Sequence, residues 1–319
     1  MTGPMKRTSK EILHRMVPNP TQRLVKWLRK SQWRVEQLER NVQRLSSALL
    51  LQQFPEIAAE HQAHSAINKF ELGVYSQNGE DGILLYIFSQ IGATNRTFVE
   101  FGIEDGRECN TANLSINFGW SGLLMDIDET SVTSARNYYA AMLGNHVKDV
   151  TILQRMITAE NIGATLAENN VDRELDLLCI DIDSNDYWVW QAIKDIHPRV
   201  VVVEYNPAYG PDRSLTIKYQ TGAFNRFDYH FSGFYYGASV TALTQLAHTK
   251  GYSLVGCDST GINAFFVRND VLKGNLKSLT PQEAYYRDMR YYSDVRQDGN
   301  LNPAEQFEYI KDLEYETIS

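Results

Sequence analysis

Glycines and carboxylates alternate in one short stretch of the sequence, between Phe98 and Gly106. Glu100, Gly102 and Gly106 follow the spacing E-x-G-x-x-x-G, and Glu104 stands between the two glycines. A dinucleotide pyrophosphate needs the tighter G-x-G-x-x-G turn, in which the backbone approaches the phosphates closely. The carboxylates of Glu104 and Asp105 would repel a diphosphate and attract a cation. The stretch therefore predicts a binding loop for a cationic ligand, with Glu100 beside the charge.

A second acidic position follows 24 residues after Gly102. Asp126 ends an apolar segment that we interpret as the second strand of a sheet, and Asp128 lies two positions further on. In dinucleotide sites, an acidic residue at this place accepts hydrogen bonds from both ribose hydroxyls. We expect Asp126, or alternatively Asp128, to bind a ribose. The other interpretation is that these glycines and acids only form turns, since both residue types are common in turns.

A third group of oxygen-bearing side chains follows the fourth and fifth predicted strands. Asp181, Asp183 and Asp186 come after the fourth strand, and Glu204 and Asn206 come after the fifth. Because these strands are neighbours in a sheet of this type, we expect the side chains to converge, and hard oxygen ligands suit Mg²⁺, Mn²⁺ or Ca²⁺. Asp181 and Glu204 would bind first, with Asp183 or Asn206 completing the set, and Asp181 and Asp183 are also candidate catalytic bases. Alternatively, Asp183, Asn185 and Asp186 cap the next helix.

Aromatic residues are concentrated between positions 205 and 236. This stretch holds ten of them in 32 positions, where the chain average of 11% would give three or four. Aromatic faces pack on sugar rings while hydroxyls bind the ring edges. The stretch therefore predicts a ligand-binding wall with Tyr209, Tyr219 and Tyr236 in contact, and His230 is a candidate base within it. The alternatives are a lid packed over the core or an oligomer contact for the aromatics, and a structural role for His230.

These residues lie at the ends of an alternating series of strands and helices. Five β-α repeats are followed by two strands that a tight turn at Asp258 and Gly261 joins. Strands that are apolar throughout, such as 200–204, are typical of a parallel sheet covered on both faces. The sequence therefore predicts an α/β fold, a doubly wound Rossmann-like sheet of seven strands with one antiparallel edge strand. The predicted strands are 97–101, 122–126, 150–154, 175–182, 200–204, 252–257 and 264–268, and the predicted helices are 78–90, 109–118, 131–143, 159–168, 187–195 and 240–249.

Residues 74–270 resemble a class I S-adenosylmethionine-dependent methyltransferase, nearest the FkbM-like branch. The matching stretches are 75–81 (YSQNGED), 100–106 (EFGIEDG), 108–111 (ECNT), 123–126 (LLMD), 178–183 (LCIDID) and 261–267 (GINAFFV). The resemblance implies the seven-stranded methyltransferase sheet, S-adenosylmethionine as methyl donor and, often, oxygen methylation of sugars or polyketides. The chain departs from the family at Glu104, where many relatives have a further glycine. It also departs at 181–184 (DIDS), where FkbM-like enzymes more often have Asp-Val-Glu-Gly.

The resemblance also implies which residues contact the donor. Gln77 would reach the methionine end, and the expected contacts are Gln77, Glu100, Gly102, Glu104, Gly106, Asn110, Asp126, Asp128 and Asp181. The expected activity is S-adenosylmethionine-dependent O-methylation of a carbohydrate or glycoconjugate, assisted by Mg²⁺ or Mn²⁺. Alternatives are a polyketide or another small alcohol as acceptor, or a non-catalytic scaffold with the same fold. An NAD-dependent oxidoreductase is disfavoured by the glycine spacing.

The formal charge of the chain, 31 basic against 39 acidic residues or −8, conceals two regions of opposite sign. Residues 1–50 carry 11 Lys and Arg against 3 Glu, or +8, which leaves −16 for the remaining 269 residues. An acidic body does not bind a phosphate backbone, so we expect no nucleic-acid partner. We expect three regions: a basic helical arm (1–66), the methyltransferase domain (67–272) and a helical tail (273–319).

The basic arm contains a heptad pattern. Leucine and valine, with one serine, recur at alternating steps of four and three residues: Leu24, Leu28, Ser31, Val35, Leu38, Val42, Leu45 and Leu49. Such a stripe is typical of a coiled coil and predicts a homo-oligomer through the N-terminal helix. One alternative is that the helix packs on the protein's own body. The other is peripheral contact with a membrane, since Trp27 and Trp33 lie among basic residues.

Targeting signals and cysteine pairs are not indicated. No run of 18 apolar residues occurs, and the charged start lacks the apolar stretch of a secretory signal, so we expect a cytoplasmic protein. Three cysteines far apart predict neither disulfides nor a zinc site. In the tail, Thr280, Pro281 and Glu283 predict a capped helix, and the sequence leaves open whether the tail covers the acceptor cleft.

Overall fold

The chain divides into two compact units, Met1–His61 and Gln62–Ser319. The computed structural model describes residues 65–286 and 301–319 and, in the arm, the positions Leu24, Leu28, Ser31, Gln32, Val35, Leu38, Asn41, Val42 and Leu45. All of these arm positions are helical, and Leu49 of the predicted heptad pattern lies outside the described residues. Within the described residues, no helix is both long and apolar enough to cross a bilayer.

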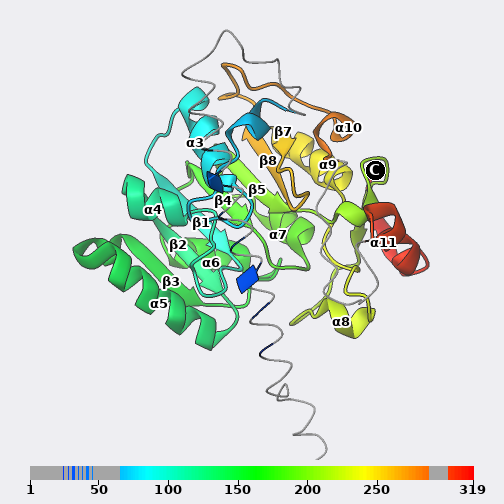
Figure 1. Cartoon of the computed structure of the whole chain (residues 1–319), viewed down its shortest axis with the longest axis horizontal. Coiled ribbons are helices and arrows are strands. Elements are labelled where there is room, and N and C mark those ends of the chain that lie inside the picture. Colours follow the sequence, from blue (N-terminus) through cyan, green and yellow to red (C-terminus); the bar gives the residue numbers. More distant parts are fainter. Residues whose placement is uncertain are drawn as a thin grey trace, which may run out of the picture. The chain divides into compact units, whose positions relative to one another are not determined.

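Seven strands form one sheet in the second unit (Figure 1). They are β1 (Thr97–Phe101), β2 (Ser121–Asp126), β3 (Val150–Gln154), β4 (Leu177–Ile180), β5 (Val200–Glu204), β7 (Tyr252–Cys257) and β8 (Asn263–Arg268). Their order across the sheet is β3-β2-β1-β4-β5-β8-β7. Strands β1 to β5 are parallel, whereas β8 runs antiparallel to both β5 and β7. This order, with a hairpin at one edge, is that of the class I methyltransferase fold, and it confirms the predicted doubly wound sheet.

Helices cover both faces of the sheet. One face packs on α3 (Glu80–Ile91), α4 (Ala112–Phe118) and α5 (Glu129–Leu143), and the other packs on α6 (Ile162–Glu168), α7 (Asp186–Ala192) and α9 (Val240–Lys250). Along β5, Val200 and Val202 belong to the first core and Val201 and Val203 to the second, because successive side chains of a strand alternate. All four are buried, which explains why this strand is apolar throughout.

Two predicted helices begin three residues later than the sequence suggested. The helix expected from Cys109 begins at Ala112, and the helix expected from Ala159 begins at Ile162. In the first case the reason is a carboxylate: Glu100 accepts hydrogen bonds from the backbone amides of Asn110 and Thr111, so the chain bends around it before the helix starts. The strands 97–101, 150–154, 200–204 and 252–257 begin and end as predicted.

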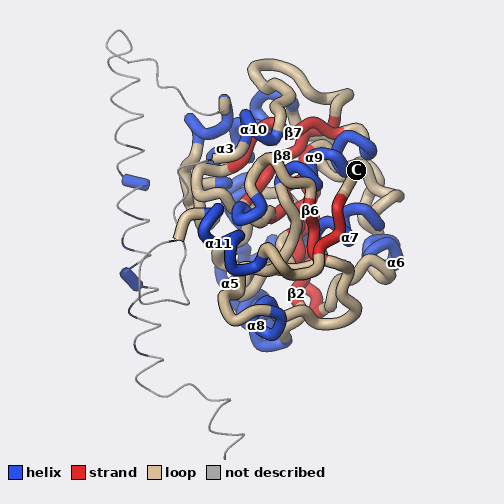
Figure 2. The backbone as a smooth tube through the Cα atoms, turned by 90° about the vertical axis from the view of Figure 1, so that its right-hand side faces the viewer, coloured by secondary structure: helices blue, strands red, loops and turns tan. Residues whose placement is uncertain are grey.

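A smaller module joins two segments that are far apart in the sequence (Figure 2). Strand β6 (Leu215–Ile217) pairs antiparallel with β9 (Tyr315–Thr317). The same segments contain the 3-10 helix η4 (Pro207–Tyr209), α8 (Arg226–Tyr229) and α11 (Pro303–Ile310), and their shared core includes Tyr209, Ile217, Tyr235, Phe307 and Ile310. We call residues 205–236 together with 301–319 the aromatic module. The predicted helical tail is therefore partly helical, through α10 (Pro281–Ala284) and α11, and it also contributes a strand.

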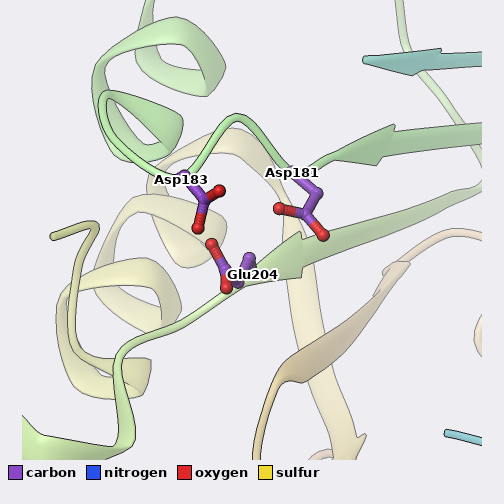
Figure 3. Close-up of side chains that lie close together, drawn as sticks. All are labelled: Asp181, Asp183 and Glu204. Atoms are coloured by element: carbon purple, nitrogen blue, oxygen red, sulfur yellow. The ribbon is translucent and has the colours of Figure 1, made fainter. Parts of the chain in front are cut away.

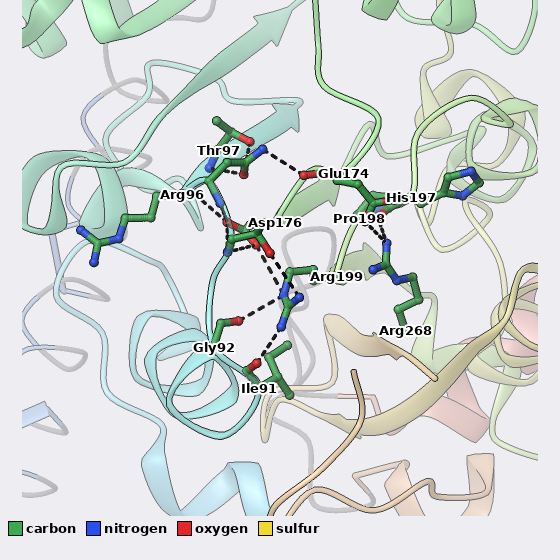
Figure 4. Close-up of polar contacts among 12 residues, drawn as sticks. Ile91, Gly92, Arg96, Thr97, Glu174, Asp176, His197, Pro198, Arg199 and Arg268 are labelled. Atoms are coloured by element: carbon green, nitrogen blue, oxygen red, sulfur yellow. Dashed lines mark hydrogen bonds and ion pairs between the residues drawn. The ribbon is translucent and has the colours of Figure 1, made fainter. Parts of the chain in front are cut away.

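At the amino end of the sheet, a buried carboxylate binds the loop in front of β1 (Figure 4). Asp176, directly before β4, accepts hydrogen bonds from three successive backbone amides, those of Thr94 (2.9 Å), Asn95 (2.9 Å) and Arg96 (2.6 Å). Arg199 forms an ion pair with Asp176 at 3.5 Å. Its guanidinium also donates to the carbonyls of Ile91 (2.6 Å) and Gly92 (3.2 Å). Because the buried charges are matched and hydrogen-bonded, this network stabilises the fold.

Candidate functional site

A large cavity opens at the carboxyl ends of β1, β2, β4 and β5. Its volume is about 610 Å³. Its wall contains the carboxylates of Glu80, Glu100, Glu104, Asp105, Glu108, Asp126, Asp181, Asp183 and Glu204, and the arginines Arg155 and Arg226. Ligands of doubly wound sheets bind at this edge, and the excess of negative charge favours a cation. We call it the carboxylate cavity.

Gly102 follows β1 and brings its loop against the end of β4. Its φ is +75°, in the left-handed region that favours glycine. A Cβ at this position would lie 1.5 Å from the carbonyl oxygen of Asp181, so a larger residue requires the backbone to move. Gly106 has the same φ but does not line the cavity, and a Cβ there would lie 2.9 Å from the Cβ of Ala135 in α5. The expected donor contact of Gly106 is therefore corrected to a packing role against α5.

Glu100 is a residue of β1, and its buried carboxylate lies at the start of α4. Its carboxylate accepts hydrogen bonds from the backbone amides of Asn110 (2.8 Å) and Thr111 (3.0 Å) and from the Thr111 hydroxyl (2.5 Å). Burial raises the pKa of Glu100 to about 7, although these hydrogen bonds act in the opposite direction. Glu100 and Asn110 both line the cavity, so the wall presents a carboxyl group that changes its charge close to neutral pH.

Asp126 ends β2 and binds the loop that follows β1. Its Oδ2 accepts a hydrogen bond from the amide of Glu104 at 2.8 Å, and its Oδ1 accepts one from the amide of Asp128 at 2.9 Å. Asp126 and Glu104 line the cavity. Asp128 instead caps α5 by accepting a hydrogen bond from the amide of Ser131 at 2.7 Å, and it does not line the cavity. Of the two residues expected to bind a ribose, the structure therefore places only Asp126 at the site.

The segment in front of α3 contributes Gln77, Asn78 and Glu80 to the cavity. Glu80 is buried and accepts hydrogen bonds from the amide of Asn78 and from the side-chain amide of Asn263, both at 2.8 Å. Asn263 stands opposite Glu204 in the β5–β8 register, and its Oδ1 has no hydrogen-bond partner within the described residues. Buried polar atoms without partners are rare, so this oxygen is available to a donor group of a ligand. Neither Glu80 nor Asn263 was predicted from the sequence as a residue of the site.

Asp181, Asp183 and Glu204 converge as predicted at the ends of β4 and β5. Figure 3 shows the three carboxylates pointing toward one another, and one oxygen of each lies within 4.8 Å of the others. Asp183 has a φ of +56°, a left-handed conformation that aspartate tolerates better than most residues. Backbone strain of this kind is concentrated at functional sites.

The electrostatics of this cluster are unfavourable without a proton or a cation. Burial raises the pKa of Asp181 well above its usual range, and the nearby Asp183 raises it further. Burial also raises the pKa of Glu204, with Asp181 as the next cause, while the guanidinium of Arg226 opposes the shift. Glu204 is 8% exposed, and its Oε2 has no hydrogen-bond partner in the described part of the chain. The pair Asp181–Glu204 therefore titrates together, and both members ionise only at a cost.

The turn in front of α7 accounts for one of the acids near β4. Asp186 accepts hydrogen bonds from the amides of Ile182 (2.8 Å) and Ser184 (2.9 Å) and so shapes the turn into α7. Asp183 lies instead 3.4 Å from the guanidinium of Arg226, measured from Oδ1 to Nη1. The alternative in which these acids only begin the next helix thus describes Asp186 and not Asp183.

Asn206 does not join the three carboxylates. Its side-chain amide donates hydrogen bonds to the carbonyls of Phe234 (2.7 Å) and Tyr236 (3.0 Å), and its Oδ1 accepts one from the amide of Ala208 at 3.0 Å. It is buried at the start of η4 and does not line the cavity. The expectation that Asn206 completes a metal site is corrected, because its amide is used to hold the aromatic module.

Three of the residues expected to bind the acceptor or act as a base lie elsewhere. Tyr209 is fully buried and its hydroxyl donates to the carbonyl of Tyr236 at 2.9 Å. The hydroxyl of Tyr219 donates to Glu160, and the Nδ1 of His230 lies 2.8 Å from the hydroxyl of Ser232. Neither Tyr219 nor His230 lines the cavity, so these three expectations are corrected. Tyr236 does line it.

The aromatic module contributes residues that the sequence analysis did not single out. They are Phe224, Arg226, Phe227, Phe234, Pro303 and Gln306. The guanidinium carbon of Arg226 lies 5.5 Å from the ring centre of Phe227 and 5.3 Å from that of Tyr236, which places its charge between the two rings. The excess of aromatic residues in 205–236 indicated that this segment forms one wall of the cavity. Pro303 and Gln306 bring the tail to the cavity, an arrangement that the sequence left open.

Comparisons with known proteins give likenesses of fold. No protein-family profile matches the sequence, and no curated protein matches it. Among solved structures, magnesium protoporphyrin IX methyltransferase from Synechocystis PCC 6803 with bound SAH is 14% identical, covers 59% of this chain and 81% of its own, and has a TM-score of 0.39. An O-methyltransferase family protein from Burkholderia thailandensis is 12% identical, covers 58% and 55%, and has a TM-score of 0.38. The glycopeptide N-methyltransferase MtfA complexed with S-adenosylmethionine is 9% identical, covers 66% and 99%, and also has a TM-score of 0.38. The strand order, and not these scores, assigns the chain to this fold class.

Proposed function

We propose that the protein is an S-adenosylmethionine-dependent methyltransferase that methylates a hydroxyl group, in line with the FkbM-like motifs of its sequence. The observation that carries the proposal is the carboxylate cavity at the carboxyl edge of a sheet with methyltransferase strand order. A cavity lined with so many carboxylates fits a donor with a sulfonium and an ammonium group, and it does not fit a diphosphate. S-adenosylmethionine, when bound, supplies an electrophilic methyl group.

The residues that would hold the donor follow from their positions around the cavity. Asp126 would accept hydrogen bonds from ribose hydroxyls, because it ends β2 and lines the wall. Glu80, Gln77 and the unpartnered Oδ1 of Asn263 would receive the ammonium group. Gly102 keeps the loop close to β4, so that Asp181 lies next to the donor loop.

The Asp181–Glu204 pair is the group that would handle the proton of the acceptor hydroxyl. Burial raises the pKa of both members, and the nearby Asp183 adds to the effect, so the pair favours holding a proton. Its ionised member can accept a proton from an alcohol within hydrogen-bond reach, which is the task of a general base. This assignment replaces the lone His230 as the base.

We propose that Mg²⁺ or Mn²⁺ binds between Asp181, Asp183 and Glu204. Three carboxylates within 4.8 Å and a buried Glu204 oxygen without a partner fit a hard divalent cation, which would remove the repulsion and polarise an acceptor oxygen. Millimolar Mg²⁺ or Mn²⁺ should then raise the melting temperature by several degrees. The shift should vanish in Asp183→Asn and persist in Glu308→Gln, an exposed acid outside the cavity. A shift that is absent in the wild type, or unchanged in Asp183→Asn, rejects the metal site.

The acceptor proposal is a carbohydrate, with Phe227 as the surface on which a sugar ring lies. Phe227 lines the cavity and is 47% exposed. Its ring packs against Gly233, where a Cβ would lie 2.5 Å from the ring, so the glycine allows this position. Flat apolar ring faces surrounded by polar groups suit the C–H face of a pyranose, whose hydroxyls can reach charged neighbours such as Arg226.

The acceptor proposal is tested with the methyl glycosides of glucose, galactose, mannose, fucose and rhamnose, using transfer of a tritiated methyl group. Phe227→Ala should raise KM about five- to tenfold with kcat little changed, because it removes ground-state packing. Phe231→Ala is the matched control, since Phe231 is 58% exposed in the same loop but does not line the cavity. Equal effects of the two substitutions, or transfer to small non-sugar alcohols alone, would reject the carbohydrate.

Calorimetry with S-adenosylmethionine decides the proposal as a whole. The wild type should bind it, and Asp126→Ala should weaken binding at least tenfold through loss of the ribose contact. A folded protein that binds no S-adenosylmethionine would contradict the enzyme and leave a scaffold with this fold.

A further inference from the structure

The described arm positions form an apolar stripe along a helix. Leu24, Leu28, Val35, Leu38, Val42 and Leu45 are all helical, and their exposed fractions lie between 50% for Leu45 and 65% for Leu38. We call these residues, with Ser31, the arm seam. Helices in proteins owe most of their stability to the packing of an apolar face. An exposed apolar seam of this kind is stabilised when a second apolar helix face packs on it.

We propose that the arm seam pairs with the same seam of a second copy, as a parallel two-stranded coiled coil. The steps of three and four residues place Leu28, Val35 and Val42 at one core position of the heptad, the a position. They place Leu24, Ser31, Leu38 and Leu45 at the other, the d position. A β-branched residue at a with leucine at d favours two parallel strands over three or four.

Charge complementarity supports the same orientation and register. In a parallel coiled coil, the residue directly before an a position is the g position, and the residue directly after a d position is the e position. Each g residue lies near the e residue of the other helix that is five positions further along the sequence. By sequence, Arg34 precedes Val35 and Glu39 follows Leu38. Each copy would thus offer Arg34 to Glu39 of the other, so the dimer has two attractive contacts beside its core.

The alternative of a membrane-surface helix fits the pattern less well. An interfacial helix needs a wide apolar face, with tryptophan on the apolar side. The arm seam occupies two of every seven positions, the narrow stripe of a coiled coil. By heptad spacing, position 33 falls away from the seam whereas position 27 directly precedes Leu28 beside it, so Trp27 and Trp33 do not share one face.

The experiment measures the mass of the full chain in solution by light scattering after size-exclusion chromatography. We expect twice the chain mass of 36.5 kDa, or 73 kDa. Leu38→Glu places a charge in the seam and should give single chains, with the dissociation constant raised at least a hundredfold. Gln37→Glu adds the same charge one position away and should leave the dimer. Circular dichroism and the melting temperature of both variants check that the second unit stays folded.

Charge reversal tests the register. Arg34→Glu should weaken the dimer about tenfold, and adding Glu39→Arg in the same chain should restore it. For the orientation, oxidised Leu45→Cys should form a disulfide between identical positions, since the native cysteines Cys109, Cys179 and Cys257 are buried. A wild-type mass of one chain or of three or more chains overturns the proposal. So does a Leu38→Glu variant that stays dimeric, a charge swap without rescue, or a monomer that sediments with phosphatidylcholine–phosphatidylserine vesicles.

Discussion

An aspartate lies directly before β4 and another directly after it, and the surroundings of the two differ. Asp176, in front of the strand, accepts three backbone amide hydrogen bonds and pairs with Arg199. Asp181, behind the strand, faces Asp183 and Glu204, and its pKa is raised well above the usual range by burial and then by the charge of Asp183. The chain between them is only four residues of β4. The same residue type beside the same strand is thus a stabilising group at one end and a destabilised group at the other.

The two ends of β4 therefore differ in whether their charges are balanced. At the amino end, matched charges and hydrogen bonds hold the loop before β1 against the sheet. At the carboxyl end, like charges are held together and Glu204 keeps an oxygen without a partner. Buried, strained and unpaired groups persist where a ligand or a reaction uses them.

The largest expected effect is on catalysis, at the carboxyl end. Asp181→Asn keeps the shape of the side chain and removes its charge and basicity. We expect a loss of about 10²- to 10⁴-fold in kcat, the range of a lost general base, while the free energy of unfolding stays equal or rises by about 1 kcal/mol because repulsion is relieved. Initial rates and urea denaturation measure the two. A marked loss of stability with activity retained would show that Asp181 is structural.

At the amino end of β4 we expect the reverse, a loss of stability instead of a loss of catalysis. Asp176→Ala leaves three backbone amides and the Arg199 guanidinium without their acceptor in a buried place. Removing one partner of a buried ion pair costs about 3–5 kcal/mol of unfolding free energy, which urea denaturation detects. Glu174→Ala serves as control, because this acid is exposed and its ion pair with Arg268 should contribute less than about 1 kcal/mol. Equal losses in the two variants would contradict the network.

Two glycines, one away from the cavity and one at it, allow the same comparison for the backbone. Gly92 (φ +76°) and Gly102 (φ +75°) have nearly the same conformation, but a Cβ on Gly92 meets nothing within 4 Å. Gly92→Ala should therefore cost only the left-handed conformation, about 1 kcal/mol. Gly102→Ala should cost about 3 kcal/mol, because its Cβ also displaces the Asp181 carbonyl, and it should abolish donor binding in calorimetry. Similar donor affinity in both variants would disprove the role of Gly102.

The smallest effect concerns pH. The pKa of Glu100 is raised to about 7 by burial, so the folded state favours the protonated form. The stability that comes from this group is present below pH 4.5 and is lost as pH rises toward 7. Binding of a cationic donor should show the reverse trend and strengthen about three- to tenfold between pH 6 and 8. Calorimetry at both pH values measures it, and Glu100→Gln should flatten the profile. An unchanged slope in that variant would assign the dependence to another group.

The sheet and half of the site were predictable because they depend on local pattern and on strand order. Apolar runs such as 200–204 define the strands, and parallel neighbours place Asp181 and Glu204 at one edge. The convergence of Asp181, Asp183 and Glu204 follows from this topology. Glu100 was expected near the donor, and its contact with the amides at 110 and 111 could not be derived from spacing alone.

The aromatic module was less predictable, since its contacts depend on residues far apart in the sequence. Strand β6 pairs with β9 across about 100 positions, with Leu215 opposite Thr317. In an irregular segment no periodicity indicates which aromatic side faces inward. Tyr209 was therefore expected at the cavity although it is buried in the module, and Phe227 was overlooked although it lines the cavity.

The negative wall of the carboxylate cavity also bears on turnover. For the proposed donor, the sulfur is positively charged before methyl transfer and neutral afterwards. The carboxylates of Glu100, Asp126 and Asp181 attract the first form more strongly than the second. The cavity would thus lose affinity for its own spent cofactor at the moment of reaction. Release of the product and entry of a fresh donor would both be favoured by the same fixed charges, without a moving part.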